Sequence, residues 1–276
     1  MEENVKTIMQ AGMALADAQN IPGHARFVVV PDGYKIHSLE SIADFPQRKR
    51  AKVTMLDAES YIAYTVKHGS LDNCTHYADV HYELARCTVV GVIDDHGSTV
   101  EESRWREHTC TFSPKLSIEW NRWIVANGSS MTQSKFAGFI EDNIQDIVSV
   151  SGSVSGAQML EMSLNFEQTS EKRFKRKIDL GNGGVQLEFV DKADDNTTSK
   201  MKVFDRFFIG IPVFQGSTDS YPLEARLKYR QNNDTLQFWF ELIRPDRVFK
   251  TAVMAELKNI QEKTGFPLLF GNAGLA

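Results

Sequence analysis

Apolar residues recur three and four positions apart in several stretches of the chain, a spacing that places them on one face of a helix. The first stretch runs from Val5 to Ala16. The best-defined helix follows Thr132, a suitable N-cap, and its apolar pattern continues to Val148. Further helices are predicted at residues 55–68, with Thr54 and Asp57 at capping-box spacing, at residues 116–125 and 156–165, and between Pro245 and Gly265.

Stretches rich in β-branched and aromatic residues predict strands in both halves of the chain. In the first half they lie at residues 27–30 and 34–39 and in the run 77–93, which forms a hairpin with residues 104–112 around an acidic tip. Between residues 34–39 and the helix at 55–68, residues 47–52 form a basic loop. The predicted strands of the second half are residues 172–180, 185–190, 201–211, 223–230 and 235–243.

These elements predict an α+β fold, with helices and a hairpin in the first half and a mainly antiparallel sheet in the second. Alternation from Leu223 to Arg230 gives this sheet one apolar face, which the C-terminal helix is expected to cover. Residues 149–156 are rich in Ser and Gly and predict a linker or mobile loop. A boundary there would divide the chain into regions 1–150 and 151–276, and one continuous domain is the alternative.

Composition excludes several classes of protein. The 276 residues are 42% hydrophobic and 24% charged, which is typical of a globular chain, and the net charge of −5 is too small for a DNA mimic or a uniformly basic surface. Three cysteines without a CxxC motif indicate neither a disulfide scaffold nor a cysteine-rich zinc site. The N-terminal segment lacks the pattern of a secretory signal, and the longest apolar runs are too short for a bilayer. We therefore expect a cytoplasmic protein without a membrane partner.

The candidates for chemistry are weak, and we assign no catalytic, cofactor-binding or metal-binding residue. His76 and His81 flank Asp79, but on a strand an odd separation directs the two rings to opposite faces. The glycine-rich residues 181–184 lie between two strands and lack the helix N-terminus that binds phosphate. If the protein is an enzyme, its site must be assembled from scattered acids such as Asp94, Asp95 and Glu119.

Two basic clusters are candidate nucleic-acid contacts, because local basic patches bind polyanions even in a mildly acidic protein. If Phe174 and Arg176 share one strand face, Lys175 and Lys177 project together from the other. Charged strands also protect sheet edges from aggregation, which is the alternative interpretation. The clusters are Arg48, Lys49, Arg50 and Lys52, and Lys172, Arg173, Lys175, Arg176 and Lys177.

Aromatic and apolar residues are candidates for self-association. Two tryptophans three positions apart with Arg122 between them are typical of a core or an interface, and base stacking is the alternative. The apolar tail, residues 265–271, must be buried in its own domain or against a neighbouring subunit. The candidate self-association residues are Trp120, Trp123, Phe266, Leu268, Leu269 and Phe270.

The block of residues 120–123, with residues 131–133 and 136–143 after it, resembles the YfdQ-like family of uncharacterised phage and prophage proteins. Residues 112–114, 264–267 and 270–271 extend the similarity along nearly the whole chain. The resemblance implies a phage-derived protein in the cytoplasm of a bacterial host, and it supplies no activity, cofactor or site residue.

We therefore expect a non-enzymatic phage or prophage accessory protein that binds a macromolecule, either nucleic acid or a host or phage protein, and that forms a homo-oligomer. The basic strand, the aromatic anchors and the apolar tail favour binding, whereas no paired catalytic groups are visible in the sequence. The alternative is an enzyme that acts on nucleic acid or nucleotides.

Overall fold

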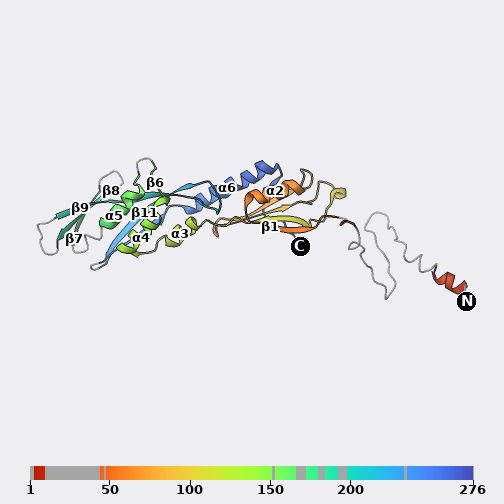
Figure 1. Cartoon of the computed structure of the whole chain (residues 1–276), viewed down its shortest axis with the longest axis horizontal. Helices are drawn as coiled ribbons and strands as arrows, with labels where there is room; N and C mark the ends of the chain where they lie inside the picture. Colours follow the sequence, from red (N-terminus) through yellow and green to blue (C-terminus); the bar gives the residue numbers. More distant parts are fainter. Residues whose placement is uncertain are drawn as a thin grey trace. The chain divides into compact units, whose positions relative to one another are not determined.

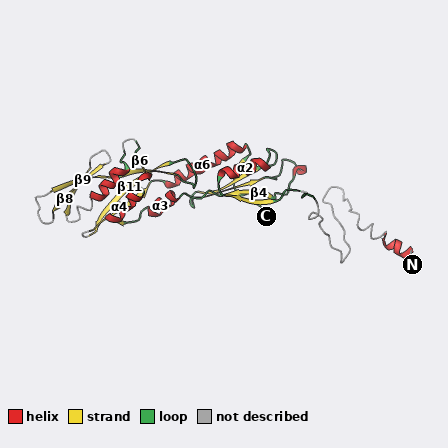
Figure 2. Cartoon of the chain, in the orientation of Figure 1, coloured by secondary structure: helices red, strands yellow, loops and turns green. Residues whose placement is uncertain are grey.

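The computed structural model divides the chain into two units, Met1–Lys49 and Arg50–Ala276. In the first unit, residues 3–9 are helical, as the start of the predicted N-terminal helix requires. The rest of that helix and the strands predicted at residues 27–30 and 34–39 lie outside the described residues. The structure describes residues 3–9, 44–46, 48–150, 153–165, 172–179, 184–191, 198–232 and 235–275 (Figures 1 and 2).

The first sheet of the second unit has five strands in the order β1-β4-β3-β2-β13. β3 pairs antiparallel with β2 and with β4, and the pairing with β4 forms the predicted hairpin with its acidic tip. β1 and β13 are the edge strands, and each pairs parallel with its neighbour. The strands are β1 (Ala51–Met55), β2 (Thr75–His81), β3 (Arg86–Val92), β4 (His108–Phe112) and β13 (Leu268–Phe270).

Two predictions change in this sheet. The run 77–93 is not one strand but two, β2 and β3, which are separated by a turn at residues 82–85 where Ala85 has a positive φ of 46°. The predicted basic loop, residues 47–52, extends into β1, which begins at Ala51. Lys52 is therefore an edge-strand residue with an exposed side chain.

The second and third sheets are antiparallel throughout, which confirms the prediction for the second half. The second sheet has the order β5-β12-β11-β10-β6, and the third has the order β7-β8-β9. The predicted strand 201–211 is divided at Asp205 into β9 and β10. The strands are β5 (Met131–Thr132), β6 (Ile147–Val148), β7 (Lys172–Asp179), β8 (Gly184–Asp191), β9 (Thr198–Phe204), β10 (Arg206–Ile211), β11 (Tyr221–Asn232) and β12 (Thr235–Leu242).

Both five-stranded sheets contain strands from each side of residue 150. β5 and β6 pair with β12 and β10, and β13 pairs with β2. In the Ser/Gly-rich segment predicted as a linker, Val154 is buried, and the Ser155 hydroxyl accepts a hydrogen bond from the amide of Gln158 at 3.3 Å. Because both sheets combine strands from the two sides of residue 150, the pairing favours one continuous domain. The division near residue 150 stays a prediction.

The helices begin where local capping chemistry places them. Thr132 caps α4 as predicted, accepting from the amide of Lys135, and Ser117 caps α3. α2 begins at Ala58 rather than residue 55, because its cap is Asp57, which accepts from the Ser60 amide at 2.7 Å, while Thr54 lies in β1. The helices are α2 (Ala58–His68), α3 (Ile118–Ala126), α4 (Gln133–Asp142), α5 (Gly156–Asn165) and α6 (Pro245–Thr264), with short 3-10 turns η2 (Val100–Glu102) and η3 (Ile144–Asp146).

Of two predicted helix ends, one is wrong and one is confirmed. α4 stops at Asp142 instead of continuing to Val148, because the chain turns through η3 and then joins the second sheet as β6. α6 ends at Gly265 as predicted, where φ is +71°, a left-handed conformation that glycine adopts without a side-chain clash. Among the described residues, no helix combines the length and apolar character needed to cross a bilayer.

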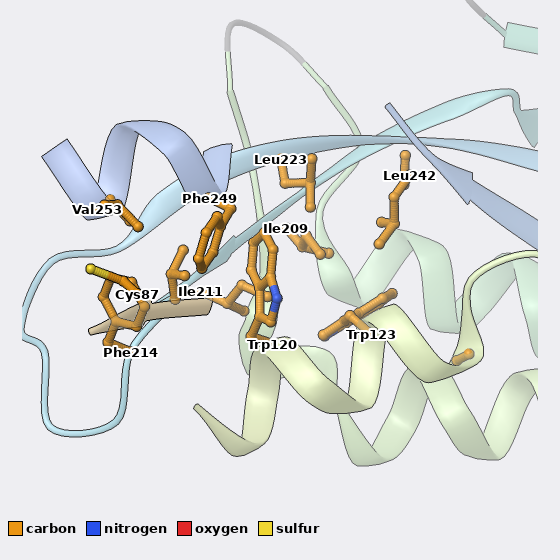
Figure 3. Close-up of a cluster of buried hydrophobic side chains, with 14 of the residues drawn as sticks. Cys87, Trp120, Trp123, Ile209, Ile211, Phe214, Leu223, Leu242, Phe249 and Val253 are labelled. Carbon is orange, nitrogen blue, oxygen red and sulfur yellow. The ribbon is translucent and has the colours of Figure 1, made fainter. Parts of the chain in front are cut away.

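The core joins α3 and α6 to the second sheet (Figure 3). Leu223, Ala225 and Leu227 of β11 are buried and Arg226 is exposed, as the alternation predicted. Figure 3 shows Phe249 of α6 beside Ile211 of β10, and Trp120 and Trp123 of α3 lie below Ile209 of the same strand. α6 therefore covers the apolar face of the sheet, and the core interpretation of the tryptophan pair is correct.

Candidate nucleic-acid interface

An exposed tryptophan lies between two arginines in the loop that joins β3 to β4. Trp105 is 73% exposed, and tryptophan is among the residue types enriched at binding interfaces. Arg104 and Arg106 flank it in the sequence, and the Arg106 side chain is only 20% exposed. The loop therefore exposes most of a tryptophan side chain next to two arginines.

The two acids at the tip of the hairpin hold this loop in place. The carboxylate of Asp94 accepts from the amides of Glu107 and His108, at 3.0 and 2.9 Å. Asp95 is buried and accepts from the hydroxyl of Tyr77 at 2.8 Å. The Asp95 carboxylate also lies 2.9 Å from Nε of Arg106. Both acids are thus engaged by groups of the protein itself.

The electrostatics of Asp95 keep it charged. Burial alone raises its pKa, but hydrogen bonds from Tyr77, Thr75 and the His96 amide, together with the charge of Arg106, lower the pKa below its ordinary value. The charged carboxylate fixes the Arg106 guanidinium, which also lies 5.7 Å from the centre of the Tyr77 ring. Arg106 has a positive φ of 55°, an unfavourable conformation for a side chain of this size that these contacts offset.

The loop, the edge strand β1 and the C-terminal segment line an open pocket of about 640 Å³. Arg50 and Lys52 contribute its basic side, and Arg50 forms a half-exposed ion pair with Glu107 at 3.5 Å, a type of pair that adds little to stability. We call this feature the Trp105 surface. Its lining residues are Arg50, Ala51, Lys52, Trp105, Arg106, Glu107, Gly274 and Leu275.

The structure places the first predicted basic cluster only partly at this surface. Arg50 and Lys52 line the pocket, whereas Arg48 and Lys49 belong to the other unit, Met1–Lys49, so the site is built without them. The sequence analysis missed Trp105 and Arg106 because it assigned residues 104–112 to a strand, whereas β4 begins at His108. The sequence Arg104-Trp105-Arg106, in which a tryptophan lies between two arginines, was the signal that could have indicated this surface.

The second predicted basic cluster lies on β7, in a different sheet from Lys52. The register shifts between Phe174 and Arg176, where Phe174 pairs with Phe189 and Arg176 with the adjacent Glu188. This irregularity interrupts the regular alternation that a shared face for Lys175 and Lys177 assumes, and that shared face stays a prediction. The other residues of this cluster, Lys172, Arg173 and Lys177, pair regularly with β8.

The predicted self-association residues divide into buried and exposed groups. Trp120 and Trp123 are 3% and 0% exposed in the core, and the ring of Phe266 packs 5.7 Å from that of His76. Leu268 is half-buried, whereas Leu269 and Phe270 are 50% and 59% exposed on the edge strand β13. Only the last two offer apolar side chains to a partner.

A second pocket, of about 460 Å³, is acidic and does not suit a polyanion. It lies between the start of α2, the loop before β11 and α6, and four carboxylates line it: Asp57, Glu59, Asp219 and Glu256. Burial raises the pKa of Glu256, the negative charges of Asp219 and Glu59 raise it further, and Lys263 partly opposes this. The Trp105 surface is therefore the better candidate for binding phosphate groups.

The acids considered for an enzyme do not form one cluster. Asp94 and Asp95 hold the hairpin loop, whereas Glu119 lies on α3 near Asp146. The pKa of Asp146 is raised by burial and by Glu119, although the indole N–H of Trp123 donates to Asp146 at 2.7 Å and opposes the shift. In the part of the chain that the structure describes, no three His, Cys, Asp or Glu side chains are grouped to hold a metal ion.

His76, a candidate metal ligand by residue type, is part of a buried structural chain of hydrogen bonds. Its Nδ1 lies 2.7 Å from the hydroxyl of Tyr61, and its Nε2 lies 3.1 Å from that of Thr264. Thr264 donates to the carbonyl of Ile260, so Nε2 carries the proton and Nδ1 accepts from Tyr61. Burial lowers the pKa of His76 to about 4, and the neutral ring links β2, α2 and α6. His81 instead lies at the surface, 3.1 Å from Asp79.

Comparisons with known proteins give one match. The sequence model of a family described as "Uncharacterized conserved protein (DUF2303)" matches residues 1–273. A search of curated proteins returns no match. A search of solved structures likewise returns no match.

Proposed function

Because the chain belongs to the DUF2303 family, whose description names no activity, we propose a function from the Trp105 surface itself: the protein binds single-stranded nucleic acid there. The observation that supports this proposal is an indole, 73% exposed, beside the cations of an edge strand. Bases stack on exposed aromatic rings in a single strand, where they are not paired, and cations next to the ring contact the phosphates.

Each part of the surface has a role in this proposal. Trp105 stacks on a base of the nucleic acid. The exposed Lys52 and Arg50 line the same pocket and contact the phosphate groups of its backbone. Arg106 lies at the base of the pocket, where its position is fixed by Asp95. We assign binding rather than catalysis to this surface because the neighbouring carboxylates are engaged, Asp95 by Arg106 and Asp94 by loop amides.

We further propose a phage or prophage origin and a cytoplasmic location. The support is the resemblance of residues 120–123 and 136–143 to the YfdQ-like family. A protein that covers single strands fits the early phage processes of replication and recombination, in which such strands are exposed. This part of the proposal rests on association and not on the geometry of the site.

The binding proposal is tested by charge reversal with a matched control. Lys52→Glu removes one phosphate contact, so the affinity for a labelled oligo(dT) should fall and the slope of log affinity against log salt should become less steep by about 0.7. Lys135→Glu makes the same charge change at an exposed position of α4, a helix that does not line the pocket. It should leave the affinity and the salt slope close to the wild-type values. Fluorescence anisotropy at several salt concentrations measures them. Equal effects of the two substitutions would overturn the proposal.

Self-association is a second proposal, supported by Leu269 and Phe270 on the edge strand β13. Replacing both residues by Asp should reduce the assembly mass in light scattering coupled to size-exclusion chromatography. These substitutions are preferable to deleting residues 266–276, because Phe266 belongs to the core of the chain. A wild-type protein that is monomeric at every concentration would contradict this proposal.

A further inference from the structure

The segment of residues 271–275 folds back from the edge strand β13. The Gly271 amide donates to the carbonyl of Ala78 at 2.8 Å, which continues the pairing of β13 with β2. The chain then turns at Gly271 and Gly274, whose φ values of +145° and +58° suit glycine. Gly274 and Leu275 reach the pocket that Lys52 of β1 lines. The segment therefore crosses from one edge of the first sheet to the other.

The sheet face opposite α2 is buried near its central strand. Val92 pairs with Thr75 on one side and Thr109 on the other, and this row alternates with the row of His76, which contacts α2. Val92 and Thr109 are 0% and 3% exposed, so the outer face has a cover at its centre. Ala273 is itself buried.

The segment of residues 271–275 is bonded to a cation of the Trp105 surface. Nη2 of Arg106 donates to the carbonyl of Ala273 at 2.7 Å, while Nε of Arg106 lies against Asp95. The segment thus occupies one side of the guanidinium and, through Gly274 and Leu275, part of the pocket wall. A phosphate that approaches Arg106 meets the backbone of this segment.

We propose that residues 271–275 are an autoinhibitory strap that competes with nucleic acid for Arg106. This inference rests on the proposed function of the Trp105 surface. The Ala273 carbonyl is a neutral acceptor, whereas a phosphate oxygen carries a negative charge and therefore adds Coulomb attraction to its hydrogen bond with the same guanidinium. Phosphate binding therefore displaces the strap, and the glycine positions at its two turns allow it to swing away.

Affinity measurements on strap variants test the competition. A chain that ends at Phe270 lacks the strap, and Ala273→Leu in the full chain introduces a side chain too large for the buried position. Both should bind labelled oligo(dT) about tenfold more tightly than the full wild-type chain, the effect of one bond to a charged group. Arg106→Ala in each background should abolish the gain. If the shortened chain fails to fold, the Ala273→Leu protein decides.

Hydrogen exchange on the unmodified full chain provides an independent readout. Saturation with oligo(dT) should accelerate exchange at the Gly271 and Gly274 amides, which in the closed strap donate to the Ala78 carbonyl and to the Asn272 side chain. Tight, salt-dependent binding by the full chain, with no gain in the strap variants and unchanged exchange, would overturn the strap and leave the proposed function standing. Absence of salt-dependent binding by both the full and the strap-free chains would overturn the proposed function, and the strap with it.

Discussion

Asp95 and Arg106 form an ion pair, with 2.9 Å between Oδ1 and Nε, within the loop that exposes Trp105. The pair explains how an acidic hairpin tip supports a cationic surface. The acid is buried and its charge is used internally, whereas the guanidinium extends toward the pocket. The tip therefore functions as a support for the basic and aromatic residues around it.

Replacing Asp95 by Asn should destabilise the protein. The substitution leaves the partly buried Arg106 without its counter-charge, and breaking such a pair costs on the order of 3 kcal/mol in the free energy of unfolding. Urea denaturation measures the loss. Asp72→Asn, at an exposed position of the same region, is the control and should change stability by less than about 0.5 kcal/mol.

The same pair makes a prediction about acid stability. The folded-state pKa of Asp95 is lowered, so its stabilising contribution is complete above the unfolded value of about 3.9 and is lost as the pH falls through the folded pKa. As the pH falls below about 5, stability should therefore decline less steeply in Asp95→Asn than in wild type. Parallel curves for the two proteins would argue against a charged Asp95.

His76 should make the protein pH-sensitive in a higher range. Its folded pKa is about 4, whereas the unfolded value is about 6.5, so the unfolded chain binds the proton first as the pH falls. Stability is therefore complete above about pH 6.5 and declines toward pH 4, by on the order of 3 kcal/mol. His76→Asn should flatten this part of the curve of unfolding free energy against pH. An unchanged slope in the variant would assign the titration to another group.

Gly91 makes room for this buried histidine, and Gly91→Ala tests that requirement. A Cβ at residue 91 would lie 2.9 Å from the Tyr61 hydroxyl and 3.3 Å from Nδ1 of His76. The clash should cost about 1–3 kcal/mol of stability, as other additions to packed cores do. Thermal or urea unfolding measures the cost, and Gly138→Ala, where a Cβ meets no atom within 4 Å, is the control. Equal stability of the two variants would show that the core relaxes around the added methyl group.

Local features of the fold were predictable from the sequence, and the long-range ones were not. Thr132 at the start of α4 and Gly265 at the end of α6 act through bonds and conformations within a few residues, so a sequence pattern contains them. The parallel pairing of β13 with β2 joins Leu268 to His76, and no local pattern specifies a partner so distant in the chain. The bulge next to Lys175 could not be predicted from the alternation of side chains either, because that pattern assumes a regular strand.

The candidate site was missed for a related reason. Trp105 and Arg106 belong to an irregular loop whose shape depends on Asp94 and Asp95, and aromatic residues in such a stretch resemble a strand by composition. The predicted residues Arg50 and Lys52 reach the same pocket only because β1 pairs with β4. Burial, which separates Trp105 from Trp120 and Trp123, is a property of the fold and is not encoded by residue type.

The most direct test of nucleic-acid binding at the Trp105 surface is the affinity of oligo(dT) for the wild type, Trp105→Ala and Trp105→Phe over a series of salt concentrations. Trp105→Ala should lose about 1–3 kcal/mol of binding free energy with an unchanged salt slope, because it removes a base stack and no phosphate contact. Trp105→Phe keeps an aromatic face and should retain most of the affinity. Equal affinity of all three proteins would contradict binding at this surface.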